Sequence, residues 1–200
     1  MQKRSLSQEP DSQFLEQVWD AIQKSKGYAS FWDWPDRRTK ECGIVCDLLE
    51  AIENKTGPQE IRRVRANKPD PPDCIGTTAS GERVAIEVTE LVDQRTVELN
   101  QAGNRVLKEW SPHELRTKLQ EIITAKDSKR FHGGPYSKTV LVIHTDEPLL
   151  SHMSCVGVLR RKKFTTCKSI TDAYLIFSGA CERGFYPFIR LETVPLFDLK

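Results

Sequence analysis

The stretch PDPPDCIGTTASGERVAIEVTEL, residues 69–91, decides how this part of the chain folds. It contains two runs of strand-like composition, 74–78 and 84–91, separated by a short turn that includes a glycine. This pattern predicts a β-hairpin. Asp73 comes directly before the first run, and Glu87 stands in the middle of the second, where an apolar residue would be the simple choice. The hairpin therefore carries two carboxylates on strands that we expect to be at least half-buried.

The composition is that of an ordinary folded domain and excludes several classes of protein. With 200 residues, 38% hydrophobic and 29% charged, the chain is long enough to bury a sizeable core. The net charge of +2 gives no reason to expect a polyanionic partner. No apolar run approaches the roughly 18 residues of a membrane span, and the N-terminus lacks the apolar segment of a secretory signal. The six cysteines form no C-x-x-C pair, so we expect reduced thiols in a cytoplasmic protein.

Hydrophobic periodicity predicts an α/β fold. Helices are expected over residues 11–26, 38–55, 93–110, 112–130 and 154–162, and strands over 60–66, 74–78, 84–91, 139–144, 173–177 and 186–191. The fourth helix is clearly marked, because Ser111, Pro112 and Glu114 form a capping box with proline at the first helical position. We expect an N-terminal helix and an aromatic connector over 1–37, followed by an α/β domain with a mixed sheet over 38–200.

Two charged residues are predicted to point from helices toward the core. On the 38–55 helix, the apolar stripe centres close to the direction of Glu41. The alternative for Glu41 is that the helix dipole favours a carboxylate near the N-terminus. On the 112–130 helix, Lys126 falls near the middle of the apolar stripe and Lys129 toward its edge. The alternative for Lys126 is a side chain that reaches the carbonyl groups of the last turn and then solvent.

Glu41, Asp73 and Glu87 are thus three acids that could converge beside a lysine. For Glu87 the alternative is a solvated strand face, because it shares the less apolar face with Ala85 and Thr89. Buried carboxylates repel one another and are costly to desolvate. A divalent cation removes this cost, and Mg²⁺ prefers oxygen ligands. A metal beside an ammonium group suits phosphodiester cleavage, since the metal lowers the pKa of bound water and the ammonium stabilises transition-state charge.

The sequence Pro72-Asp73, a turn and then Glu87-Val88-Thr89 resembles the motif of the PD-(D/E)XK, or restriction-endonuclease-like, nuclease superfamily. The resemblance covers residues 38–145 and leaves 146–200 as a C-terminal extension. It implies an αβββαβ core with a mixed central sheet flanked by helices. It also implies a nuclease that acts on DNA with Mg²⁺ or Mn²⁺ as cofactor.

By this resemblance Glu41, Asp73 and Glu87 would bind the metal, and Asp73 and Glu87 would act in catalysis together with a lysine. In the superfamily that lysine stands two residues after the second acid, where this chain has Thr89. Some members supply the lysine from the following helix. Lys126 is then the first candidate, because it lies centrally on the inward face of that helix. Lys129, toward the edge of the same face, is the second.

The missing strand lysine favours a second hypothesis, a catalytically inactive nuclease-like domain that serves as a binding or assembly module. A third is an ordinary α/β protein whose acids are solvated. Three basic clusters could contact phosphate groups if they share one face, and the alternative is that each is an ordinary solvated surface. The clusters are Arg37, Arg38 and Lys40; Arg62, Arg63 and Arg65; and Arg160, Arg161, Lys162 and Lys163.

Overall fold

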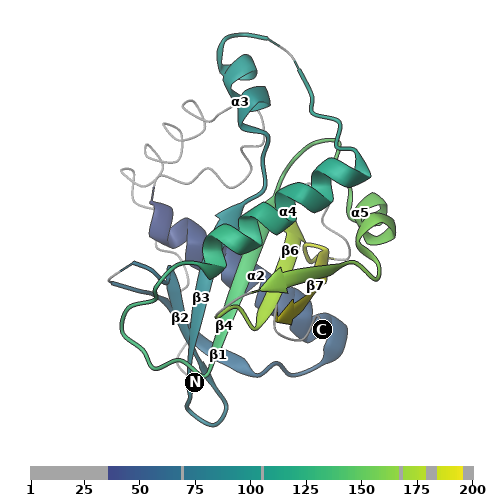
Figure 1. Cartoon of the computed structure of the whole chain (residues 1–200). Helices are drawn as coiled ribbons and strands as arrows, with labels where there is room; N and C mark the ends of the chain where they lie inside the picture. The colour runs from purple at the N-terminus through teal and green to yellow at the C-terminus, as the bar shows by residue number, and fades with distance from the viewer. Residues whose placement is uncertain (1–35, 69, 105, 167–168, 179–183, 196–200) are drawn as a thin grey trace, which may run out of the picture.

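The computed structural model describes residues 36–195 except 69, 105, 167–168 and 179–183 (Figure 1). In chain order the elements are α2 (Arg37–Thr56), β1 (Ile61–Ala66), β2 (Cys74–Thr78), β3 (Arg83–Glu90), α3 (Gln94–Gln101), α4 (Pro112–Asp127), β4 (Lys138–Thr145), α5 (His152–Leu159), β5 (Lys163–Thr166), β6 (Asp172–Phe177) and β7 (Phe188–Pro195). The helix predicted over 11–26 and most of the connector after it lie outside the described residues.

The strands form one mixed sheet of seven strands in the order β1-β2-β3-β4-β6-β7-β5. Strands β1, β2 and β3 pair antiparallel as a meander, whereas β3, β4 and β6 run parallel. Strand β7 is antiparallel to β6 and parallel to β5. The strands after residue 146 join the same sheet, so the predicted C-terminal extension completes the sheet of the core.

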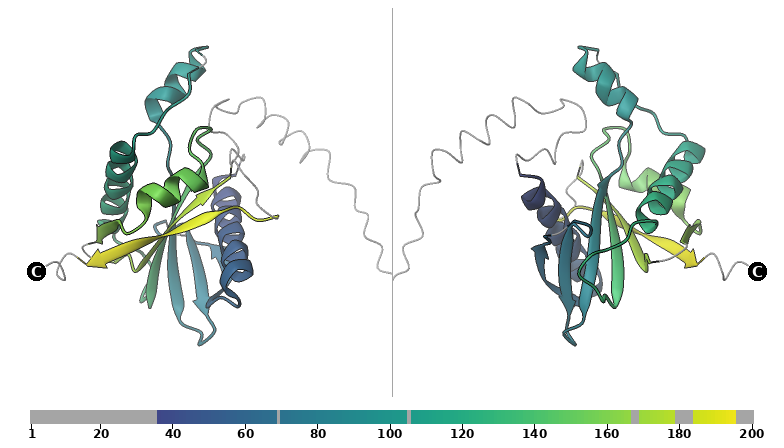
Figure 2. Two further views of the ribbon diagram at one scale, coloured as in Figure 1. Left: turned by 90° about the vertical axis from the view of Figure 1, so that its right-hand side faces the viewer. Right: turned by 60° about the vertical axis from the view of Figure 1, so that its left-hand side comes forward.

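Helices cover both faces of the sheet: α2 lies on one face, and α4 and α5 lie on the other (Figure 2). Helix α2 packs Ile44 and Leu48 against Ile86 of β3. On the opposite face α4 packs Leu119 against Leu141 of β4. Strands β3 and β4 are therefore covered on both sides, which explains why they are buried almost throughout. Helix α3 projects away from this layered body (Figures 1 and 2).

The predicted α/β class and the mixed sheet flanked by helices are confirmed, and several elements differ from expectation in their bounds or were not predicted. Helix α3 ends at Gln101 instead of residue 110, because Gly103 adopts φ +87°, a left-handed conformation that ends helices. Helix α4 ends at Asp127 instead of residue 130. Strand β5 was not predicted, because its four residues are too few to show a period. None of the helices in the described part of the chain has the length and apolar character needed to span a membrane.

Candidate metal site

The hairpin of β2 and β3 brings Asp73 and Glu87 together. Cys74 pairs with Ile86 in the antiparallel ladder, so the next position along sets Asp73 opposite Glu87, on the same face of the sheet. The Val88 amide donates a hydrogen bond of 2.7 Å to Asp73 Oδ2, which fixes this carboxylate against β3. The Asp73 and Glu87 side chains are each only 1% exposed. Glu87 therefore points into the protein, and the solvated strand face is wrong.

A third acid, Asp70, completes a compact set. Carboxylate oxygens of Asp70, Asp73 and Glu87 all lie within 4.8 Å of one another, close enough to hold one metal ion. Asp70 sits in the loop before β2, which Asn67 closes through a side-chain hydrogen bond of 3.1 Å to the Pro72 carbonyl. Asp70 was not predicted, because periodicity assigns no direction to a loop residue. The available signal was the repeated Pro-Asp pair in the sequence PDPPD.

Two lysines reach Glu87 from the end of α4. The Nζ atom of Lys126 lies 2.7 Å from Glu87 Oε1 and 3.2 Å from the Val88 carbonyl oxygen. The Nζ atom of Lys129, just beyond the helix, lies 2.5 Å from the same carboxylate oxygen. The predicted inward direction of Lys126 is confirmed, and Lys129 points the same way. Thr89, in the motif position, is half-buried on the Glu87 face of β3.

The second oxygen of Glu87 is different. Glu87 Oε2 is buried and has no hydrogen-bond partner among the described residues. A buried carboxylate oxygen without a partner is costly, because the group has lost water and gained nothing in exchange. The Glu87 side chain is 1% exposed. A cation that accepts an electron pair from this oxygen would therefore offset the cost of burying it.

Arg37 connects the fourth acid, Glu41, to this set. Helix α2 starts where the Asp36 side chain accepts a hydrogen bond from the Thr39 amide, so Arg37 and Glu41 lie one turn apart. Arg37 Nε donates to Glu41 Oε1 at 2.6 Å, and Arg37 Nη2 donates to Asp73 Oδ1 at 3.3 Å. Glu41 is buried, as the helix pattern predicts. It stands beside the compact set, and Arg37 lies between it and Asp73.

The surroundings shift the pKa values of the two hairpin acids in opposite directions. Burial raises the pKa of Asp73 to about 6; the hydrogen bond from Val88 opposes this shift, and the nearby Glu87 and Glu41 charges add to it. Burial alone would also raise the pKa of Glu87, but hydrogen bonds from Lys126 and Lys129 outweigh it and lower that pKa. A proton on Asp73 near neutral pH would compete with a metal for the same oxygens.

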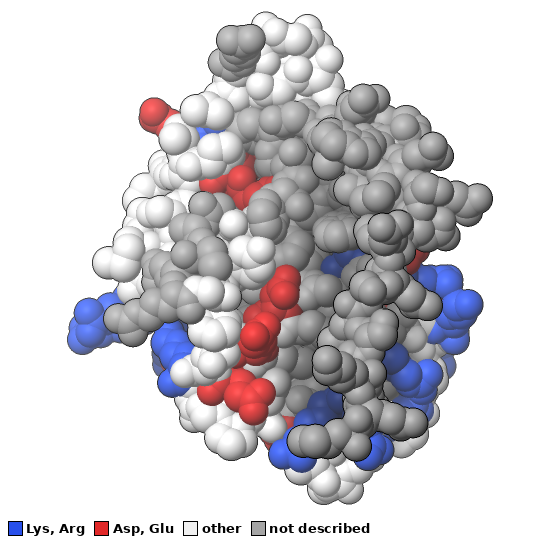
Figure 3. Space-filling model, turned by 180° about the vertical axis from the view of Figure 1, so that it is seen from behind, with Lys and Arg blue, Asp and Glu red and all other residues white. Residues whose placement is uncertain are grey.

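Two of the three basic clusters lie far apart in the fold. Arg62, Arg63 and Arg65 are exposed on β1 at one edge of the sheet. The cluster at 160–163 is exposed next to β5, at the opposite edge. The cluster at the start of α2 is the one beside the acids. Seen from behind, basic side chains lie on both sides of the molecule, with more of them on the right, and acidic ones lie nearer the middle of the view (Figure 3).

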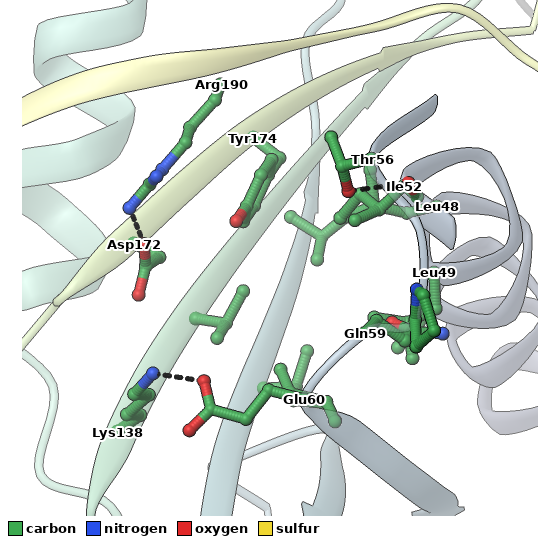
Figure 4. Close-up of a pocket in the computed structure, with 16 residues that line it drawn as sticks. Leu48, Leu49, Ile52, Thr56, Gln59, Glu60, Lys138, Asp172, Tyr174 and Arg190 are labelled. Atoms are coloured by element: carbon green, nitrogen blue, oxygen red, sulfur yellow. Dashed lines mark hydrogen bonds and ion pairs between the residues drawn. The ribbon is translucent and has the colours of Figure 1, made fainter. Parts of the chain in front are cut away.

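A hollow of about 390 Å³ lies on the other face of the sheet (Figure 4). Apolar side chains of α2 line one wall, including Leu48 and Ile52, and Tyr174 of β6 lines another. Ion pairs between Lys138 and Glu60 and between Arg190 and Asp172 stand at its rim. The hollow borders the Ile86 face of β3, opposite the Glu87 face, so it is not part of the acid site.

Among the described residues, Cys42, Cys46, Cys74 and Cys155 form no disulfide. The Sγ atoms of Cys42 and Cys74 lie 3.2 Å apart and pack the first turns of α2 against the start of β2.

The chain matches no known protein family, no curated protein and no solved structure.

Proposed function

We propose that the protein is a metal-dependent nuclease that cleaves DNA on a restriction-endonuclease-like core. Asp70, Asp73 and Glu87 act as metal ligands. Glu41 is predicted to be a further ligand. Lys126 acts as the charge-stabilising base in place of the lysine that the motif would put at Thr89. Mg²⁺ or Mn²⁺ is the expected cofactor, since the donor set consists of carboxylate oxygens.

The observation that carries the proposal is the pair of contacts at Glu87. One carboxylate oxygen accepts from Lys126 at 2.7 Å, while the other is buried and unpartnered among the described residues. Such a carboxylate can bind a lysine and a cation at once. The order α2, β1, β2, β3, α4, β4 supports the αβββαβ core that the resemblance implies, with α3 as an insertion.

Each residue then has a distinct task. Asp73, fixed by the Val88 amide, holds its carboxylate in place without rearrangement. When bound, the divalent cation supplies Lewis-acid polarisation of a phosphate oxygen and activation of a water molecule. The Lys126 side chain is only 17% exposed, and its ammonium group provides a positive charge where the phosphate gains negative charge in the transition state. Lys129, at 38% exposure, adds a second positive charge nearer to solvent.

A polymeric substrate suits an open site. The Asp70 side chain is 51% exposed and Arg37 is 68% exposed, so the site opens to solvent on the side of Asp70, where a long phosphodiester chain can approach. The exposed arginines of β1 lie on the strand next to the hairpin and can contact the phosphates of a bound duplex.

The direct test is cleavage of plasmid and oligonucleotide DNA with Mg²⁺ or Mn²⁺, comparing the wild type with Asp73→Ala. We expect cleavage by the wild type only, and EDTA should abolish it. Equal cleavage by both proteins would identify a contaminating nuclease. A protein that binds Mn²⁺ and yet cleaves no DNA would contradict the proposal.

A second function has its own support, namely a catalytically inactive nuclease-like domain that binds DNA or assembles with a partner. Lys126, Lys129 and Arg37 already compensate most of the charge of the acids without any metal. DNA binding that is equally strong with EDTA and with Mn²⁺, together with absence of cleavage, would favour this alternative.

A further inference from the structure

We propose that Arg37 is an exchangeable cation of the acid site. Its guanidinium group holds the carboxylates in the metal-free protein, gives way when a divalent cation binds, and then contacts a phosphate group of the substrate. This inference rests on the proposed function and names a residue that links metal binding to substrate binding.

The contacts of Arg37 overlap with those of the candidate metal. Its Nη2 atom lies 3.3 Å from Asp73 Oδ1 and 3.6 Å from Asp70 Oδ2, and both acids belong to the compact set. Its Nε atom lies 2.6 Å from Glu41 Oε1. A divalent cation bound through these oxygens would carry the same sign of charge as the guanidinium group. The two cations therefore repel each other and compete for the same carboxylates.

Among the cations that pair with these acids, Arg37 is the easiest to displace. Its side chain is 68% exposed, whereas the Lys126 side chain is 17% exposed and packs beneath the site. Water and salt therefore screen the guanidinium charge more than they screen the buried ammonium group. Glu87 pairs with Lys126 and Lys129 instead of Arg37, and it keeps these two lysines during the exchange. Asp70, Asp73 and Glu41 thus lose their arginine, while Glu87 and its two lysines stay in place.

The released guanidinium group remains next to the metal, because Arg37 belongs to the first turn of α2. Arginine binds phosphate oxygens through two parallel hydrogen bonds, which a lysine cannot do. A phosphodiester that approaches the metal from solvent would meet this group at the open side of the site. The same residue would then weaken metal binding in the free protein and strengthen substrate binding in the complex.

The test measures these two effects separately in Arg37→Gln. Isothermal titration with Mn²⁺ should show tighter binding by about three- to tenfold, because the competing charge is gone. DNA cleavage at saturating Mn²⁺ should fall by about ten- to a hundredfold in kcat/KM, because a charged phosphate contact is lost. Arg38→Gln is the matched control, since Arg38 is the next residue of the same helix and is exposed. It should leave Mn²⁺ affinity unchanged.

Arg37→Lys provides a second variant that keeps the charge and loses the paired donors. It should bind Mn²⁺ like the wild type and cleave more slowly. Unchanged or weaker Mn²⁺ binding by folded Arg37→Gln would overturn the exchange and leave the proposed nuclease intact. Tighter Mn²⁺ binding by Arg37→Gln with no cleavage by the wild type would overturn the nuclease and the phosphate contact. No Mn²⁺ binding by any of the proteins would overturn both proposals.

Discussion

Replacement of Lys126 with methionine tests whether α4 supplies the missing lysine of the motif. Methionine keeps an unbranched apolar stem and removes the ammonium group, so packing against the sheet changes little. Lys118→Met on the same helix is the control, because the lysines that pair with Glu87 among the described residues are Lys126 and Lys129. The comparison separates the loss of a charge at the site from the loss of a lysine elsewhere on α4.

The size of the effect follows from the contacts. Lys126 Nζ lies 2.7 Å from a carboxylate that is 1% exposed. A hydrogen bond to a charged group contributes about 1.5–3 kcal/mol. Lys129 still contacts the same oxygen, at 2.5 Å, so we expect the free energy of unfolding to fall by about 2 kcal/mol. In a protein of this size that corresponds to a decrease in Tm of about 4–8 °C.

Thermal unfolding of Lys126→Met, Glu87→Gln and the double variant measures this term as a coupling free energy. DNA cleavage by the same proteins measures the contribution of Lys126 to catalysis. We expect Lys126→Met to lower the cleavage rate by about a hundred- to a thousandfold. Lys118→Met should keep the Tm within about 2 °C and most of the activity. A coupling below about 0.5 kcal/mol would refute the stability reasoning. Loss of cleavage in Lys118→Met but not in Lys126→Met would refute the role of Lys126.

Two further predictions concern the acids and the hairpin. Burial raises the pKa of Asp73 to about 6 in the folded protein, so a proton occupies the carboxylate below that pH and Mn²⁺ affinity should rise about tenfold from pH 5 to pH 7. Asp47→Asn, which removes another acid whose pKa burial raises to about 6, should leave this profile unchanged, and an affinity independent of pH would contradict the assignment. Gly76→Ala should destabilise the protein by about 1–3 kcal/mol, because the new Cβ would lie 2.6 Å from Ile61 Cγ2. Gly43→Ala, where the Cβ meets nothing within 4 Å inside α2, should stabilise it, and equal unfolding midpoints for the two variants would show that the hairpin yields without cost.

The central hairpin could be predicted because its order is local. Alternation along 84–91 and the glycine-containing turn define the pairing of β2 with β3, and this register alone places Asp73 opposite Glu87. The helix pattern gave the inward direction of Lys126 for the same reason, since a regular helix fixes the direction of each side chain. Strand β5 was not predicted, because its pairing with β7 depends on a distant part of the chain and not on its own four residues.

The candidate site was predictable only where its residues lie on regular elements. Asp70 lies in a loop whose shape depends on hydrogen bonds between Asn67 and the backbone of Pro72 and Asp73. Lys129 lies beyond the last residue of α4, where the helical wheel no longer defines a direction. Arg37 begins α2, and its contacts with Asp73 and Asp70 require the hairpin to be in place. These three residues join the site through tertiary packing, which a one-dimensional pattern does not contain.

A lysine supplied from α4, as proposed for Lys126, differs structurally from a lysine on β3. A lysine at the position of Thr89 would share its strand with Glu87, so their separation would be fixed by β3 alone. Lys126 instead reaches Glu87 across the interface between α4 and the sheet, which Leu119 and Ile123 hold by packing against β4 and its neighbours. The distance between the ammonium group and the carboxylate therefore depends on how firmly the helix is docked. In this fold the charge at the site is a property of core packing, and Glu87 in turn holds the end of α4 against the sheet.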